Sequence, residues 1–84
     1  MSDSVMSLVT LYTKPGCHLC DDALRILQRV QAAQPFQLET VNIEDDASLL
    51  AEYGEHIPVV TLNGAFLFEY EVDETRLRQL LKEV

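Results

Sequence analysis

The sequence predicts an α/β domain with the element order β-α-β-α-β-β-α and a four-stranded mixed sheet flanked by helices. Three observations lead to this prediction. Runs rich in β-branched residues alternate with segments whose apolar residues recur at helical spacing. The pair Asn63-Gly64, a strong hairpin signal, separates the last two strand-like runs. With 84 residues, the chain is short enough that residues 1–84 are expected to form one domain.

The first half of the chain predicts a strand, a long helix and a second strand. Residues 7–13 are rich in Val, Leu, Thr and Tyr, which favours a strand. Residues 17–33 carry an apolar stripe at helical spacing, and Pro35 ends this helix. Residues 36–43 form the next strand, in which the apolar alternation slips phase, indicating burial on both faces or a bulge. A helix between the two strands predicts a parallel, right-handed crossover.

The second half predicts a short helix, a hairpin and a terminal helix. The short helix begins with Asp45 or Asp46 as its N-cap, and Gly54 lies just past its end. Residues 58–70 form the hairpin, whose two strands are antiparallel. Asp73 caps the last helix, which is amphipathic. The apolar stripe of this helix consists of Leu77, Leu80, Leu81 and Val84.

The charge balance limits the classes of partner. Fourteen acidic and six basic residues leave a formal net charge of −8. Because nucleic acids and anionic membranes both bind basic surfaces, we expect neither as a partner. The first residues show no basic start and no long apolar run, so we expect a cytoplasmic protein without a signal peptide or spanning helix. In a reducing compartment, two close cysteines favour catalysis or metal binding over a permanent structural bond.

Both cysteines lie in the stretch "KPGCHLCDDA", where the first strand gives way to the long helix. Cys17 is expected at the start of the helix and Cys20 one turn later on its buried stripe, close enough for a disulfide. The unpaired N–H groups of the first turn favour a thiolate at Cys17, which lowers its pKa. This asymmetry predicts Cys17 as the nucleophile and Cys20 as the resolving thiol. Lys14 adds to the effect, whereas Asp21 and Asp22 weaken it.

Two other interpretations of the cysteine pair stay open. The cysteines could be structural neighbours without chemistry, or they could hold a metal. Tetrahedral zinc needs four ligands, and besides the cysteines the chain offers only His18 and His56. His18 is poorly aimed at a metal between the cysteines, and His56 approaches only if the loop before Pro58 folds over Cys17. We therefore predict no metal site within the chain.

The motifs resemble the thioredoxin superfamily, and most closely its glutaredoxin branch, over nearly the whole chain. The resemblance rests on "LYTKPGCHLC", on "EHIPVVTLNG" and on the terminal amphipathic helix. It implies a thioredoxin fold and a redox-active disulfide between Cys17 and Cys20. Lys14 matches a lysine that glutaredoxins carry three residues before the first cysteine. Ile57-Pro58 matches the cis-proline loop of the family, which implies a cis bond beside Cys17 and Ile57 backbone groups that pair with a substrate.

Two departures from the glutaredoxin pattern affect the expected partner. The chain has Cys-His-Leu-Cys where glutaredoxins usually have Cys-Pro-Tyr-Cys. Glutathione-binding members carry a Gly-Gly pair and an acidic residue after the hairpin, where this chain has "FEYEVDE". The bulk of Phe68 and Tyr70 and the charges of Glu69 and Glu71 oppose an anionic tripeptide.

The resulting prediction is a monomeric, glutaredoxin-like thiol-disulfide oxidoreductase that works in electron transport. It needs no metal or organic cofactor and acts on a protein dithiol or disulfide, with glutathione as an alternative partner. Cys17 and Cys20 are its catalytic residues; Lys14, Ile57 and Pro58 bind the substrate. The rival hypothesis is a module of the same fold without turnover, either bridging two subunits through a metal or iron–sulfur cluster or serving as an interaction domain.

Overall fold

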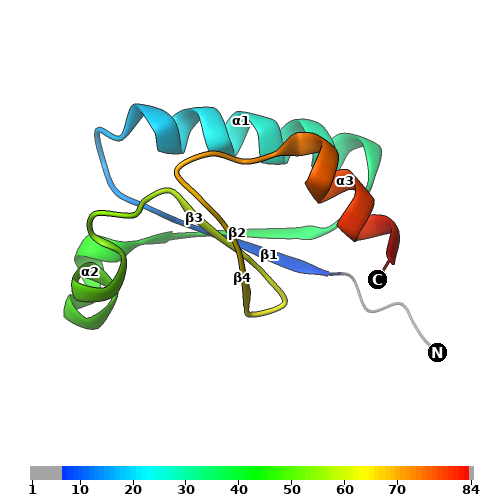
Figure 1. Cartoon of the computed structure of the whole chain (residues 1–84). Coiled ribbons are helices and arrows are strands. Elements are labelled where there is room, and N and C mark those ends of the chain that lie inside the picture. The colour runs from blue at the N-terminus through cyan, green and yellow to red at the C-terminus, as the bar shows by residue number, and fades with distance from the viewer. Residues whose placement is uncertain (1–6, 84) are drawn as a thin grey trace.

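The computed structural model describes residues 7–83 and contains a four-stranded sheet with three α-helices (Figure 1). The strands and helices follow the predicted order. They are β1 (Leu8–Thr13), α1 (His18–Ala33), β2 (Gln37–Asn42), α2 (Ala47–Tyr53), β3 (Val59–Leu62), β4 (Ala65–Glu69) and α3 (Glu74–Glu83). A short 3₁₀ helix, η1 (Ile43–Asp45), which the sequence did not predict, joins β2 to α2. Residue Val84 of the predicted last stripe lies outside the described residues.

The sheet is mixed, as predicted, and has the strand order β2-β1-β3-β4. β1 pairs with β2 in parallel, whereas β1 with β3 and β3 with β4 are antiparallel. β2 is therefore an edge strand, and none of its residues is buried. Its pairing with β1 runs without a register shift, so the expectation of two-sided burial or a bulge in this strand was wrong. The bulge lies instead in the hairpin, where the register shifts between Val60 and Thr61.

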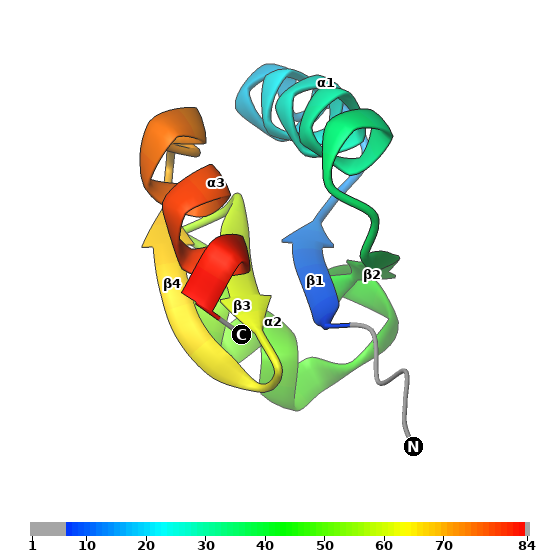
Figure 2. The same cartoon turned by 90° about the vertical axis from the view of Figure 1, so that its right-hand side faces the viewer.

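α1 and α3 cover one face of the sheet, and α2 lies near the other face at one end (Figures 1 and 2). Alternate residues of the central strands meet the two covering helices to form the main core, as strand geometry requires. The buried members of this core are Val9, Leu11, Ala23, Leu27, Val30, Phe36, Val60, Val72 and Leu77. α3 is also tied to α1 by an ion pair between Arg29 and Glu74, 2.7 Å long. Within residues 7–83, no helix is long and apolar enough to cross a membrane.

The helix and turn signals of the sequence have the expected structural roles. The Asp46 carboxylate accepts hydrogen bonds from the first backbone N–H groups of α2, so Asp46 rather than Asp45 is its N-cap. The Asp73 carboxylate accepts a hydrogen bond from the Arg76 backbone N–H at 3.0 Å, at the start of α3. Asn63 and Gly64 both have positive φ, 53° and 88°, as a two-residue hairpin turn of type I′ requires.

Candidate active site

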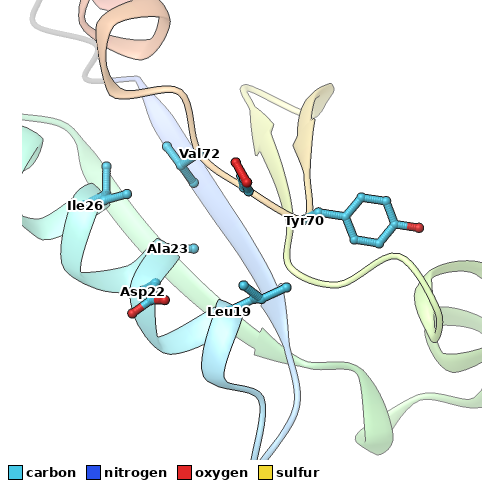
Figure 3. A pocket seen from close by; sticks show the side chains of 7 residues that line it. Leu19, Asp22, Ala23, Ile26, Tyr70 and Val72 are labelled. Atoms are coloured by element: carbon cyan, nitrogen blue, oxygen red, sulfur yellow. The ribbon is translucent and has the colours of Figure 1, made fainter.

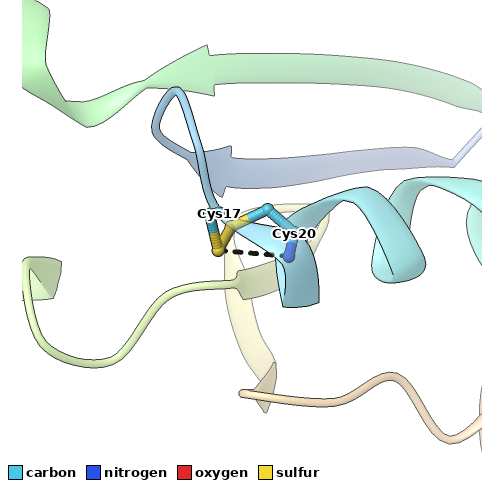
Figure 4. The surroundings of a disulfide bond; sticks show 2 residues. All are labelled: Cys17 and Cys20. Atoms are coloured by element: carbon cyan, nitrogen blue, oxygen red, sulfur yellow. Dashed lines mark hydrogen bonds between the residues drawn. A yellow bond between two sulfur atoms is a disulfide. The ribbon is translucent and has the colours of Figure 1, made fainter.

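The N-terminus of α1 positions the first cysteine. The loop after β1 turns at Gly16, whose φ of 81° is one that glycine adopts without strain. Cys17 follows as the N-cap of α1, with extended backbone angles, and its sulfur accepts a hydrogen bond from the Cys20 backbone N–H at 3.2 Å (Figure 4). The sulfur thus takes the place of the oxygen that usually caps a helix. An N–H group directed at this sulfur stabilises a negative charge on it.

The two cysteines differ in exposure, as the amphipathic pattern predicted. Their sulfur atoms are joined as a disulfide, and their Cα atoms are 5.2 Å apart (Figure 4). Cys20 is only 2% exposed, whereas Cys17 is partly exposed at the end of the helix. Cys17 is therefore the more accessible of the two cysteines.

The loop that carries the cis-proline packs beside the disulfide. The Ile57–Pro58 peptide bond is cis, which confirms what the family resemblance implied. Ile57 is buried in a small apolar cluster with Cys20 and Ile43, and Cys17 packs against the same cluster. The Pro58 side chain is fully buried. Segments far apart in the sequence thus meet at the two cysteines.

Two tyrosines complete the small cluster from the strand and helix beside it. Tyr12 at the end of β1 and Tyr53 at the end of α2 both pack against the cluster, and their ring centroids are 4.8 Å apart. Burial raises the pKa of Tyr53, and the charges of Glu52 and Tyr12 raise it further. The Tyr53 phenol therefore stays neutral at physiological pH.

Lys14 lies in the loop between β1 and α1, close to the buried Cys20. It lines a hollow of about 270 Å³ together with Cys20, Asp21 and Asn42. Because Asp21 borders the same hollow, its carboxylate offsets part of the field of the Lys14 ammonium group. Asp22, which we expected to weaken a thiolate in the same way, forms an ion pair with Arg25 instead.

Neither histidine is placed to share a metal with the cysteines. His18 is exposed. His56 lies 3.2 Å from the Glu69 carboxylate and 3.3 Å from the Tyr70 hydroxyl, so it faces β4 rather than folding over Cys17. Among the residues that the structure describes, no three His, Cys, Asp or Glu side chains are grouped to hold a metal ion.

A second hollow is lined by a different set of α1 residues from the hollow that Lys14 borders. Figure 3 shows the side chains that line it. It has a volume of about 230 Å³ and opens between the first turns of α1 and the segment after β4. It is lined by Leu19, Asp22, Ala23, Ile26, Tyr70, Glu71 and Val72. The sequence indicated only the bulk of Tyr70. Nothing in the local sequence indicates that Tyr70 has a φ of 68° or that its hydroxyl contacts the loop before the cis-proline.

Comparisons with known proteins show the family to which the chain belongs. A family model described as Glutaredoxin-like domain (DUF836) matches residues 8–82. The uncharacterized protein Rv0508 of Mycobacterium tuberculosis is 36% identical over 75 residues, covering 83% of this chain and 77% of that protein. The X-ray structure of protein XcR50 from X. campestris has a TM-score of 0.74 and 33% sequence identity, covering 90% of this chain and 97% of that one.

A more distant likeness concerns the fold alone. A mutant thioredoxin from Halobacterium salinarum is 15% identical with a TM-score of 0.69, covering 94% of this chain and 74% of that one. Together with the mixed sheet and its flanking helices, this likeness confirms the predicted thioredoxin fold.

Proposed function

Because this chain belongs to the glutaredoxin-like domain family (DUF836), we propose that it is a thiol-disulfide oxidoreductase with Cys17 as nucleophile and Cys20 as resolving thiol. The observation that supports this most directly is the N-cap position of Cys17. Its sulfur receives the Cys20 N–H at 3.2 Å while remaining partly exposed. A thiolate that is both stabilised and accessible is what attack on a disulfide requires.

The proposed reaction involves only the two thiols of this chain and one disulfide of the partner. The Cys17 thiolate attacks a sulfur of the partner, the partner S–S bond breaks, and the released sulfur takes up a proton. Cys20 then loses its proton and attacks the Cys17 sulfur, which frees the second partner thiol and closes the Cys17–Cys20 disulfide. Two electrons pass from the protein to the partner, and the reverse sequence oxidises a partner dithiol.

The residues around the disulfide have supporting roles in this proposal. The Lys14 ammonium group favours the thiolate, and Asp21 moderates it. Ile57 and Pro58 hold the backbone of their loop beside Cys17, because Ile57 packs in the same cluster as the cysteines. Backbone groups of Ile57 pair with the extended partner segment. The reaction uses protein sulfur alone, without metal or organic cofactor, and we propose a reducing compartment, the cytoplasm, as its setting.

The test is equilibration of the protein in glutathione buffers of graded redox poise, followed by acid trapping and intact mass measurement. We expect a reversible loss of two hydrogens at a defined poise, which corresponds to the Cys17–Cys20 disulfide. Cys17→Ser and Cys20→Ser variants should not show this change. Two thiols that stay reduced at every poise would sink the proposal. Metal that copurifies with such an unreactive protein would favour the rival module in which the cysteines bridge two subunits.

A further inference from the structure

The turn between β4 and α3 holds a bulky residue in an unfavourable backbone conformation. Tyr70 has a φ of 68°, in the left-handed region that large side chains rarely adopt. Its backbone N–H donates a hydrogen bond to the Pro58 carbonyl oxygen at 2.8 Å, so the turn is fixed to the cis-proline loop. Strain of this kind persists only where surrounding contacts impose it, and it gathers at binding sites. The conformation of Tyr70 therefore points to a role for this turn.

The Tyr70 side chain extends the same connection. Its hydroxyl donates a hydrogen bond to the Glu55 carbonyl oxygen at 3.3 Å and lies 3.3 Å from His56 Nδ1. His56 Nδ1 in turn lies 3.2 Å from a Glu69 carboxylate oxygen. Figure 3 shows the Tyr70 ring directed away from the side chains of α1. Tyr70 thus borders the hollow beside α1 while its ring points away from the α1 side chains.

The hollow is apolar and small. Leu19, Ala23 and Ile26 of α1 face Val72 across it (Figure 3). Its volume of about 230 Å³ lies below the roughly 300–1,000 Å³ of ordinary small-molecule sites. Such a hollow suits one side chain of a larger partner better than a whole ligand. Leu19 is 47% exposed and directly precedes Cys20 in the chain. A partner side chain that contacts Leu19 in the hollow would therefore lie close to the disulfide.

The rim of the hollow carries negative charge. Asp22 and Glu71 both border it. Asp22 is paired with Arg25, whereas Glu71 forms no salt bridge within residues 7–83. The formal net charge of −8 adds a field of the same sign over the whole molecule. Anionic partners are therefore repelled, and a cationic group is attracted to Glu71.

We propose that this hollow is a docking subsite for a cationic protein partner. An apolar side chain near the partner's redox-active cysteine enters the hollow, and a neighbouring Lys or Arg contacts Glu71. The inference rests on the proposed oxidoreductase function and adds its substrate class, which is disulfides in basic, apolar protein segments rather than the anionic disulfide of glutathione.

The test compares two synthetic disulfide peptides that differ only in charge. Both carry a leucine beside the cysteine, and the next residue is lysine in one and glutamate in the other. With the reduced protein, we expect the lysine peptide to react about tenfold faster at low ionic strength. This advantage should shrink in about 0.5 M salt, where surface charges are screened. Glu71→Gln should reduce it several-fold, whereas the control Glu39→Gln, on the edge strand β2, should leave it unchanged.

The outcomes separate the substrate class from the reaction itself. Equal rates for the two peptides, or an advantage that survives Glu71→Gln, would overturn the docking proposal. Faster reaction with glutathione disulfide than with either peptide would also overturn it, while supporting the oxidoreductase. A protein that reacts with no disulfide at all would refute the proposed function on which the inference rests. A dimer that Leu19→Asp dissociates would assign the hollow to a second copy of the chain.

Discussion

Replacing Tyr70 by alanine and by glycine isolates the backbone conformation of the turn between β4 and α3. Both variants lose the phenol and its hydrogen bonds, so these losses cancel when the variants are compared. A left-handed conformation costs an L residue about 1–2 kcal/mol, a penalty that glycine escapes. Glycine loses more chain entropy on folding, which costs roughly 0.5–1 kcal/mol relative to alanine. We therefore expect Tyr70→Gly to be more stable than Tyr70→Ala by about 0.5–1 kcal/mol.

Urea unfolding of the oxidised protein measures this difference. With a slope near 1–1.5 kcal/mol/M, the midpoint of the glycine variant should lie about 0.5 M higher. Leu50, an exposed residue in the middle of α2, provides the control, because a helical position is normally more stable with alanine than with glycine. At this position the free energy of unfolding should be about 1 kcal/mol higher for the alanine variant than for the glycine variant. If alanine were the more stable residue at both positions, the argument from the Tyr70 conformation would be wrong.

Three further predictions concern the core, the acid stability and the chemistry. Leu27→Ala, at a fully buried position of the main core, should lower the free energy of unfolding by about 2–5 kcal/mol. Leu50→Ala should change it by less than about 0.5 kcal/mol, and similar losses at the two sites would contradict the assigned core. Hydrogen bonds from Arg29 and Arg78 lower the pKa of Glu74 below 4.5. The contribution of Glu74 to folding stability is therefore present above that pH and is lost as the pH falls through the folded-state pKa. Glu74→Gln should therefore be less stable than the wild type at neutral pH, and acid should close the gap; a constant gap would refute the linkage. With an excess of disulfide peptide, Cys20→Ser should accumulate a mixed disulfide at Cys17, whereas Cys17→Ser should form little, because Cys20 is 2% exposed. Intact mass under non-reducing conditions measures the adduct of each variant. Faster adduct formation at Cys20 than at Cys17 would reverse the assigned roles.

The parts of the fold that could be predicted depend on local chemistry. Aspartates before α2 and α3, the Asn63-Gly64 turn and the apolar stripe of α1 each act over a few residues, and each has its expected role. The exception is Leu19, which the helical spacing placed on the buried stripe of α1 but which is 47% exposed. The place of Cys17 at the start of α1 and the burial of Cys20 follow from the same local signals.

The features that could not be predicted depend on contacts between distant segments. β2 is poorly buried because it lies at the edge of the sheet, and its own residues do not reveal its position there. The orientation of His56 and the backbone of Tyr70 result from a contact between the cis-proline loop and the turn after β4. The sequence suggested bulk and charge at this turn, but it could not reveal that the turn is hydrogen-bonded to that loop.

The disulfide does not share the main hydrophobic core of the molecule. Cys20 belongs to a separate small cluster with Ile43 and Ile57, and α2, which flanks this cluster, contributes no buried residue. Few apolar contacts therefore resist a local opening of α2 and the cis-proline loop, while the layer between the sheet and α1 and α3 stays closed. Amide protons at the two ends of the molecule should consequently exchange on different timescales. The end that carries the sulfur atoms can therefore change its conformation while the main core remains folded.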